Sequence, residues 1–174
     1  FESTGGLRVG DPVTFTGELL SVELGPGLLT QVFDGLQNPL PQLAEQCGFF
    51  LQRGMYLDPL DRERAWAFTP VATAGDAVRA GDTLGTVPEG IFEHRIMAPF
   101  RLQGTWKVKE IVEAGDHKIK DRIAVLEDDN GRTQDVSMFQ TWPVKVPIRA
   151  YEERLRPTEP LVTQVRIIDT FFPV

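Results

Sequence analysis

The chain has 174 residues, 41% of them hydrophobic and 25% charged, so we expect a packed core of one ordinary domain or one and a half small ones. A net charge of -7 argues against a nucleic-acid partner and disfavours an anionic membrane surface, and no apolar run is long enough to span a membrane. The single cysteine, Cys47, cannot form an internal disulfide, which indicates a reducing compartment.

The predicted elements begin with a short strand and glycine-rich turns in residues 1–17. Apolar residues at helical spacing predict a helix over 28–36, ended by Gly35 and Pro39, and a second short helix is predicted over 42–47, ended by Gly48. From 49 to about 139 the sequence changes to short β-type runs separated by Gly, Pro and Asp. The remaining part, from 141, is proline-spaced and extended.

Short turn sequences punctuate the β-rich region. Asn130-Gly131 predicts a hairpin turn in which both residues take positive φ. The tripeptide Ala-Gly-Asp occurs at 74–76 and again at 114–116, with similar apolar positions around it. This weak repeat predicts two similar β halves folded against each other, a mainly β, barrel-sandwich-hybrid module of biotinyl or lipoyl type, with short helices in the flanking segments. The predicted turn residues are Gly75, Asp76, Gly81, Asp82, Gly115 and Asp116.

The chemistry of a biotinyl or lipoyl carrier is missing, because such modules need a lysine at the tip of a hairpin and 126–131 reads Leu-Glu-Asp-Asp-Asn-Gly. His94 and His117 are predicted to be surface histidines in turns, without a patterned set of metal ligands. The glycines at 25–27 lead into no phosphate-binding loop, and Pro26 lacks a donating amide. We therefore predict no catalytic, cofactor-binding or metal-binding residue in this chain.

Several blocks of sequence resemble the catalytic A-type polypeptide of the V-type and A-type rotary ATPases. They include "SVELGPGLLTQVFDGLQNPL", "LDRERAWAFTP" and "TWPVK", and they occur in the order found in that family. The resembling blocks are 21–40, 60–70, 81–89, 141–145 and 160–174.

The resemblance implies a division of the chain. Residues 1–17 resemble the last strand of the family's N-terminal β-barrel and the link that follows, 18–45 the start of the nucleotide-binding domain, 46–140 an inserted β module (the non-homologous or bulge region), and 141–174 the return into the nucleotide-binding domain before its phosphate loop. The family usually has Gly-Gln where this chain has Gln164-Val165. Because glycine takes positive φ freely and glutamine does not, we do not expect the family's local turn to carry over unchanged.

The resemblance also implies a function. The parent polypeptide would bind ATP and Mg and couple ATP hydrolysis or synthesis to proton or sodium ion transport, in a cytoplasmic, peripherally membrane-associated complex. This segment would hold no cofactor, and its partners would be other rotary ATPase polypeptides, the B-type polypeptide and the peripheral stalk. The alternative is a stand-alone biotinyl/lipoyl-like binding module without the carrier lysine. The candidate contact surface lies in 85–104 and consists of Ile91, Phe92, Glu93, His94, Arg95, Ile96 and Phe100.

Overall fold

The computed structural model describes residues 5–15, 17, 19–29, 31–48, 50, 55–150 and 158–171. Neither helix within these ranges has the length and apolar character that crossing a membrane requires. The elements in these ranges are β1 (Ser21–Leu24), α1 (Leu40–Cys47), β2 (Ala65–Pro70), β3 (Ala77–Val78), β4 (Thr83–Glu89), β5 (Phe92–Met97), β6 (Trp106–Ile111), β7 (Gly115–Lys118), β8 (Ala124–Glu127), β9 (Thr133–Val136), β10 (Gln140–Pro143) and α2 (Arg166–Phe171).

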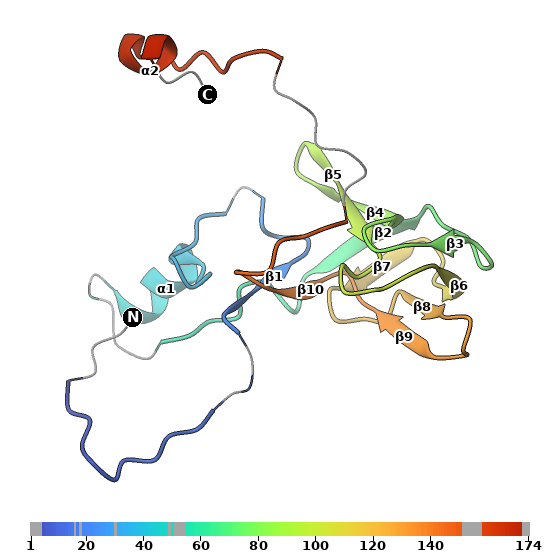
Figure 1. The fold of residues 1–174 in the computed structure, drawn as a ribbon, viewed down its shortest axis with the longest axis horizontal. Helices are drawn as coiled ribbons and strands as arrows, with labels where there is room; N and C mark the ends of the chain where they lie inside the picture. The colour runs from blue at the N-terminus through green and yellow to red at the C-terminus, as the bar shows by residue number, and fades with distance from the viewer. Residues whose placement is uncertain are drawn as a thin grey trace.

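The strands form two four-stranded antiparallel sheets, in the order β5-β4-β2-β7 and β3-β6-β8-β9 (Figure 1). A separate antiparallel pair joins β1 to β10, with Ser21 opposite Pro143 and Leu24 opposite Gln140. This pair brings together segments that lie more than a hundred positions apart in the sequence. The mainly β, barrel-sandwich prediction is confirmed, and α1 and α2 are the short helices of the flanks.

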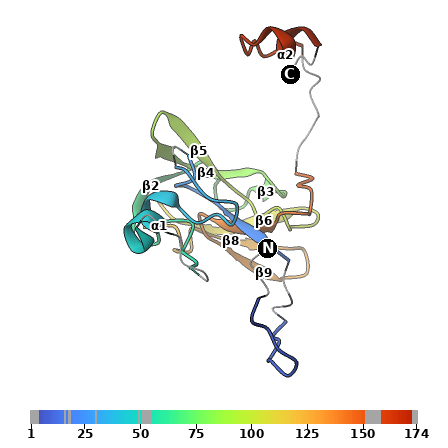
Figure 2. The same cartoon turned by 90° about the vertical axis from the view of Figure 1, so that its left-hand side faces the viewer.

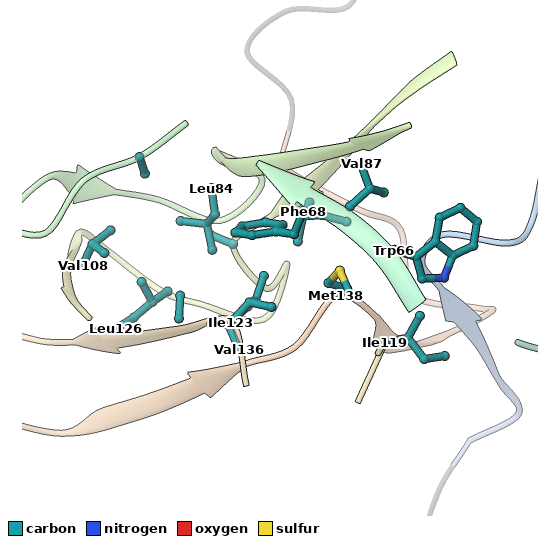
Figure 3. Packing of buried hydrophobic residues seen from close by; sticks show 14 of the residues in the cluster. Trp66, Phe68, Leu84, Val87, Val108, Ile119, Ile123, Leu126, Val136 and Met138 are labelled. Carbon is teal, nitrogen blue, oxygen red and sulfur yellow. The ribbon is translucent and has the colours of Figure 1, made fainter. Parts of the chain in front are cut away.

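The core lies between the two sheets (Figure 3). Alternation along β2 turns Trp66 and Phe68 inward and leaves their neighbours exposed, as expected for a strand with one buried face. Leu84 and Val87 of β4 are fully buried beside them. The opposite sheet and its connections contribute the buried residues Val108, Ile119, Ile123, Leu126, Val136 and Met138.

The turns at Gly75 and Gly81 are confirmed. Both glycines have positive φ, 99° and 87°. In each turn the aspartate that follows folds its carboxylate back onto the chain: Asp76 accepts the amide and hydroxyl of Thr73, at 2.7 and 3.0 Å, and Asp82 accepts the Arg79 amide at 2.7 Å. Such side-chain bonds to nearby backbone groups explain why aspartate recurs at this turn position.

The turn predicted at Gly115-Asp116 is wrong. These residues open strand β7, where Gly115 lies opposite Phe68 of β2, and Gly115 is not among the positive-φ glycines. The corresponding turn comes a few residues later, at 118–121, where the Asp121 carboxylate accepts the Lys118 amide at 2.7 Å. The sequence hid this turn because it contains no glycine.

The hairpin at 128–132 is present, but its predicted conformation is wrong. Gly131 has a φ of 78°, whereas Asn130 is not among the positive-φ residues. The Asp128 amide bonds to the Arg132 carbonyl and the Gly131 amide to the Asp128 carbonyl, which makes a three-residue loop with glycine in the left-handed position. The Asp128 carboxylate accepts the amides of Asn130 and Arg132 and holds the loop.

The flanks depart from prediction at two places. The expected helix over 28–36 does not form among the described residues of that span, because Asp34 accepts the amides of Leu36 and Asn38 and closes a turn, and Gln37 takes a φ of 65°. The second helix is confirmed as α1. Residues 5–15 and 17 contain no strand, and Val9 and Phe15 are exposed to solvent, since a lone strand has no partner to bond.

Gln164 also differs from expectation. It takes a φ of 67°, the left-handed conformation that we expected glutamine to avoid. The Asp169 carboxylate in α2 accepts the amides of Thr163 and Gln164, at 2.9 and 3.0 Å, and these bonds hold the turn. The described residues of α2 are all unburied, and Figures 1 and 2 both place this helix away from the two sheets.

Candidate functional site

The predicted contact residues lie on the hairpin of β4 and β5, which projects from its sheet (Figure 1). At the tip, Ile91 is 92% exposed and Phe92 is 52% exposed. Glu93 is exposed and accepts the Thr86 hydroxyl at 2.9 Å. Arg95 is exposed and makes no ion pair with any described residue. The hairpin therefore presents two apolar side chains and one unpaired cation to solvent.

Two of the predicted contact residues serve packing instead. Ile96 is 2% exposed and belongs to the core, so it forms no part of an accessible surface. Phe100 is half-buried and packs edge-to-face against Trp142 of β10, with ring centroids 5.8 Å apart. The inward position of Ile96 follows from alternation along β5, where His94 and Ile96 share the more buried face.

His94 belongs to a buried polar cluster centred on Glu89, which sequence reasoning missed. The Glu89 side chain is only 5% exposed, and its Oε2 lies 2.7 Å from Nδ1 of His94. Its Oε1 accepts the amides of Gly27 and Leu29, at 2.7 and 3.0 Å. A buried carboxylate is stable only when hydrogen bonds replace its water, and these three supply them. Glu89 thereby fastens the hairpin to a loop 60 residues away in the sequence.

This cluster also decides the use of the glycines at 25–27. The amides of Gly27 and Leu29, which a bound phosphate would need, already donate to Glu89. Gly25 is required for a different reason, since a Cβ there would lie 2.7 Å from Cβ of Phe139. The loop is built to pack closely against the β module, not to receive an anion.

A second tie joins the flank to the module through Arg62. Its Nη2 donates to both carboxylate oxygens of Glu23 in β1, at 2.6 and 2.7 Å, and to Asp58 at 3.3 Å. The guanidinium also lies over the Phe139 ring, 4.9 Å from its centroid. Burial acts to lower the pKa of Arg62, but the hydrogen bonds to Glu23 and Asp58 outweigh it and raise that pKa. Arg62 therefore stays cationic and links β1 to residues 58 and 139.

A groove of about 490 Å³ lies beside these ties. One wall is formed by residues 94–97 of β5 and by 99–101, and the other by 134–141, which include part of β9. The groove brings together four of the predicted contact residues, His94, Arg95, Ile96 and Phe100. Its volume is in the range of sites that bind ligands or peptide side chains.

The histidines are not in turns, as predicted, but in strands. His94 lies in β5, and His117 lies in β7 with its ring against the edge of Phe68, at a centroid distance of 6.2 Å. Within the described ranges no three His, Cys, Asp or Glu side chains gather as a metal site would require. The tip of the 128–132 hairpin presents aspartate, asparagine and glycine where a carrier would need lysine.

Comparison with known proteins identifies the module. Residues 57–145 match the family model described as the ATPsynthase alpha/beta subunit barrel-sandwich domain. The whole chain is 59% identical to the V-type ATP synthase alpha chains of Borreliella burgdorferi (strain ZS7), Borrelia hermsii and Treponema denticola. In each case 100% of this chain is aligned, and it spans 30% of the length of the relative.

Proposed function

The chain belongs to the family of the ATPsynthase alpha/beta subunit barrel-sandwich domain, and from this premise we propose that it is part of the catalytic A-type polypeptide of a V-type or A-type rotary ATPase. The observation that carries the proposal is the 59% identity, along all of the chain, to V-type ATP synthase alpha chains. The complete enzyme would be cytoplasmic and peripherally membrane-associated, and would couple ATP hydrolysis or synthesis to proton or sodium ion transport.

Within that polypeptide, residues 46–140 form an inserted module, and 18–45 and 141–174 belong to the nucleotide-binding domain. The pairing of β1 with β10 supports this division, because it brings the departing and returning segments together at one place. Residues 1–17 would lead in from an N-terminal β-barrel. Glu89 and Arg62 then hold the module in a fixed position on the flanks, at the loop 25–29 and at β1.

We assign ATP and Mg binding to other parts of the parent polypeptide. The 174 residues contain no GxxxxGK[ST] sequence, and two amides of the 25–29 loop are occupied by Glu89. Titration calorimetry of this chain with Mg-ATP should therefore show no binding in the micromolar range. A micromolar affinity with release of phosphate would contradict the assignment.

The role proposed for the module is to dock other polypeptides of the complex, the B-type polypeptide and those of the peripheral stalk. The exposed apolar tip of the β4–β5 hairpin supports this role, since Ile91 and Phe92 project from a paired ribbon into solvent. Apolar side chains clustered on an exposed projection are typical of interaction sites. A fixed anchor at Glu89, the last residue of β4, suits a contact that must transmit force.

Docking is tested with purified peripheral-stalk polypeptides of the parent enzyme and the full-length parent polypeptide carrying Ile91→Ser. We expect weaker capture of the stalk polypeptides by this variant, because the tip loses its most exposed apolar side chain. Val71→Ser is the matched control, since Val71 is also 60% exposed but lies outside the hairpin. Equal capture by the unaltered protein and both variants would refute docking through the hairpin tip.

A further inference from the structure

The groove runs along the free edge of a sheet. Strand β5 ends one four-stranded sheet, and β4 is its one pairing partner among the described strands. Strand β9 ends the other sheet in the same way, next to β8. The walls of the groove contain the consecutive residues 94–97 of β5 and 134–136 of β9. Because successive side chains point to opposite faces, a wall of consecutive residues means that the backbone edge itself borders the groove.

A free edge of this kind can accept another strand. Its outward amides and carbonyls lack strand partners within the described part of the chain, and an extended peptide can bond to them in register. Natural proteins protect free edges with charge, prolines or a covering segment. On β5 that protection consists of Glu93 and Arg95 on the outward face, and Glu93 is already bonded to Thr86.

The charge of the groove differs from that of the chain. The chain carries a net charge of -7, whereas the groove is lined by Arg95 and Arg101 and by one acidic residue, Asp135. Asp135 lies 3.8 Å from the guanidinium of Arg122, which offsets its charge. Arg95 has no ion-pair partner among the described residues. The lining therefore favours an acidic occupant.

The floor of the groove is apolar. Leu28, Phe100 and Met138 are among its lining residues, and all three are at least half-buried. In an added strand every second side chain would face this floor and the others would face outward. A sequence in which apolar and acidic residues alternate meets both the apolar floor and the two arginines.

We propose that the groove binds an extended segment of a partner protein, with alternating apolar and acidic residues, which adds as a strand to the free edge of β5. The proposal rests on the docking role given above and specifies the manner of binding. Backbone hydrogen bonds to β5 supply the register, the floor receives the apolar side chains, and Arg95 and Arg101 pair with the carboxylates.

The test uses two blocked ten-residue peptides as probes, one alternating Val with Glu and the other alternating Val with Lys. Binding is measured by fluorescence anisotropy, and amide hydrogen exchange locates it. The Val-Glu peptide should bind saturably and slow exchange in 92–97, and the Val-Lys peptide should bind at least about tenfold more weakly. This comparison uses the unaltered chain and does not depend on any variant folding.

A charge-reversed variant, Arg95→Glu with Arg101→Glu, should reverse the preference between the two peptides. Lys120→Glu is the control, since Lys120 is exposed and lies outside the groove. Equal binding of both peptides, or slowed exchange confined to 133–136, would overturn strand addition to β5. Capture of the stalk polypeptides with no change of exchange at 92–97 would overturn strand addition alone. Loss of capture with intact peptide binding would overturn only the docking role.

Discussion

Glu89 offers the sharpest test of how the module is held. Replacing Glu89 with alanine removes the acceptor shared by the Gly27 and Leu29 amides and the partner of the His94 ring. Replacing it with glutamine keeps an oxygen for the amides and places an N–H group opposite His94. The two variants therefore separate the loss of the hydrogen bonds from the loss of the charge.

The expected cost follows from the geometry. Hydrogen bonds to a charged group contribute about 1.5–3 kcal/mol each. Leu29 is 39% exposed, so water replaces part of what its amide loses, and the main cost falls on Gly27 and His94. We expect Glu89→Ala to lower the free energy of unfolding by about 2–4 kcal/mol, and Glu89→Gln by about 1 kcal/mol or less.

Urea unfolding followed by circular dichroism measures these costs, and hydrogen exchange locates them. In Glu89→Ala the amides of Gly27 and Leu29 should exchange faster, while those of the β6–β8 sheet keep their protection apart from the global change. Glu93→Gln is the matched control, because Glu93 is exposed and its loss should stay within about 0.5 kcal/mol. Unchanged exchange at Gly27 in Glu89→Ala would refute the anchor.

Three further predictions concern the turns and the core. Gly75→Val should cost about 1–3 kcal/mol in a thermal melt because Gly75 has a φ of 99°, whereas Gly115→Val should be nearly neutral, and equal costs would remove the distinction between turn and strand. Gly85→Ala should unfold the chain at much lower urea, since its Cβ would collide with the buried Phe68 ring; an unchanged urea midpoint would mean that the two sheets separate easily. Hydrogen bonds from the amide and hydroxyl of Thr73 lower the pKa of Asp76, so its stabilisation is complete above the ordinary value of about 3.9 and is lost as pH falls through the lowered pKa. Asp76→Asn should therefore flatten the acid limb of stability against pH, and a limb of unchanged slope would argue against this turn.

Much of the fold could be predicted because its determinants are local. The alternation at 65–70 and the glycines at 75 and 81 depend on neighbours within a few residues, and the structure confirms both. The misplaced turn at Gly115 shows the limit of this approach, because the pattern Ala-Gly-Asp was repeated without its geometry. The turn that replaces it uses Asp121 alone, since the carboxylate bond to Lys118 closes the turn without glycine.

The helix over 28–36 failed for a related reason. Its apolar spacing satisfied a helical period, but Asp34 and Asn38 offer the backbone a competing set of side-chain hydrogen bonds. Asn38 also accepts the Leu57 amide at 2.9 Å, a contact 19 residues away. A period of apolar residues shows which face can be buried, but it does not show whether a helix or a looped segment will bury it.

The candidate site was harder to predict because its main residues act across long separations. Ile91 and Phe92 could be found because exposed apolar residues beside a turn stand out in a sequence. Glu89 and Arg62 could not, since a glutamate before a glycine and an arginine in a charged stretch have no local pattern that marks them as buried. Their partners lie 62 and 39 positions away, at Gly27 and Glu23.

These long-range ties also explain why the boundary of the module is not visible in its hydrophobic pattern. The core of the two sheets runs from Leu60 to Met138, yet Leu28 and Phe139 pack against it from the flanks. Two of the contacts that hold the flank are a buried carboxylate with its hydrogen bonds and a cation over a ring, not an apolar seam. Polar ties of this kind fix the relative position of two parts through the direction of each bond, whereas an apolar seam allows them to slide. An inserted module held in this way can project its hairpin from the parent polypeptide and still move with it as one body.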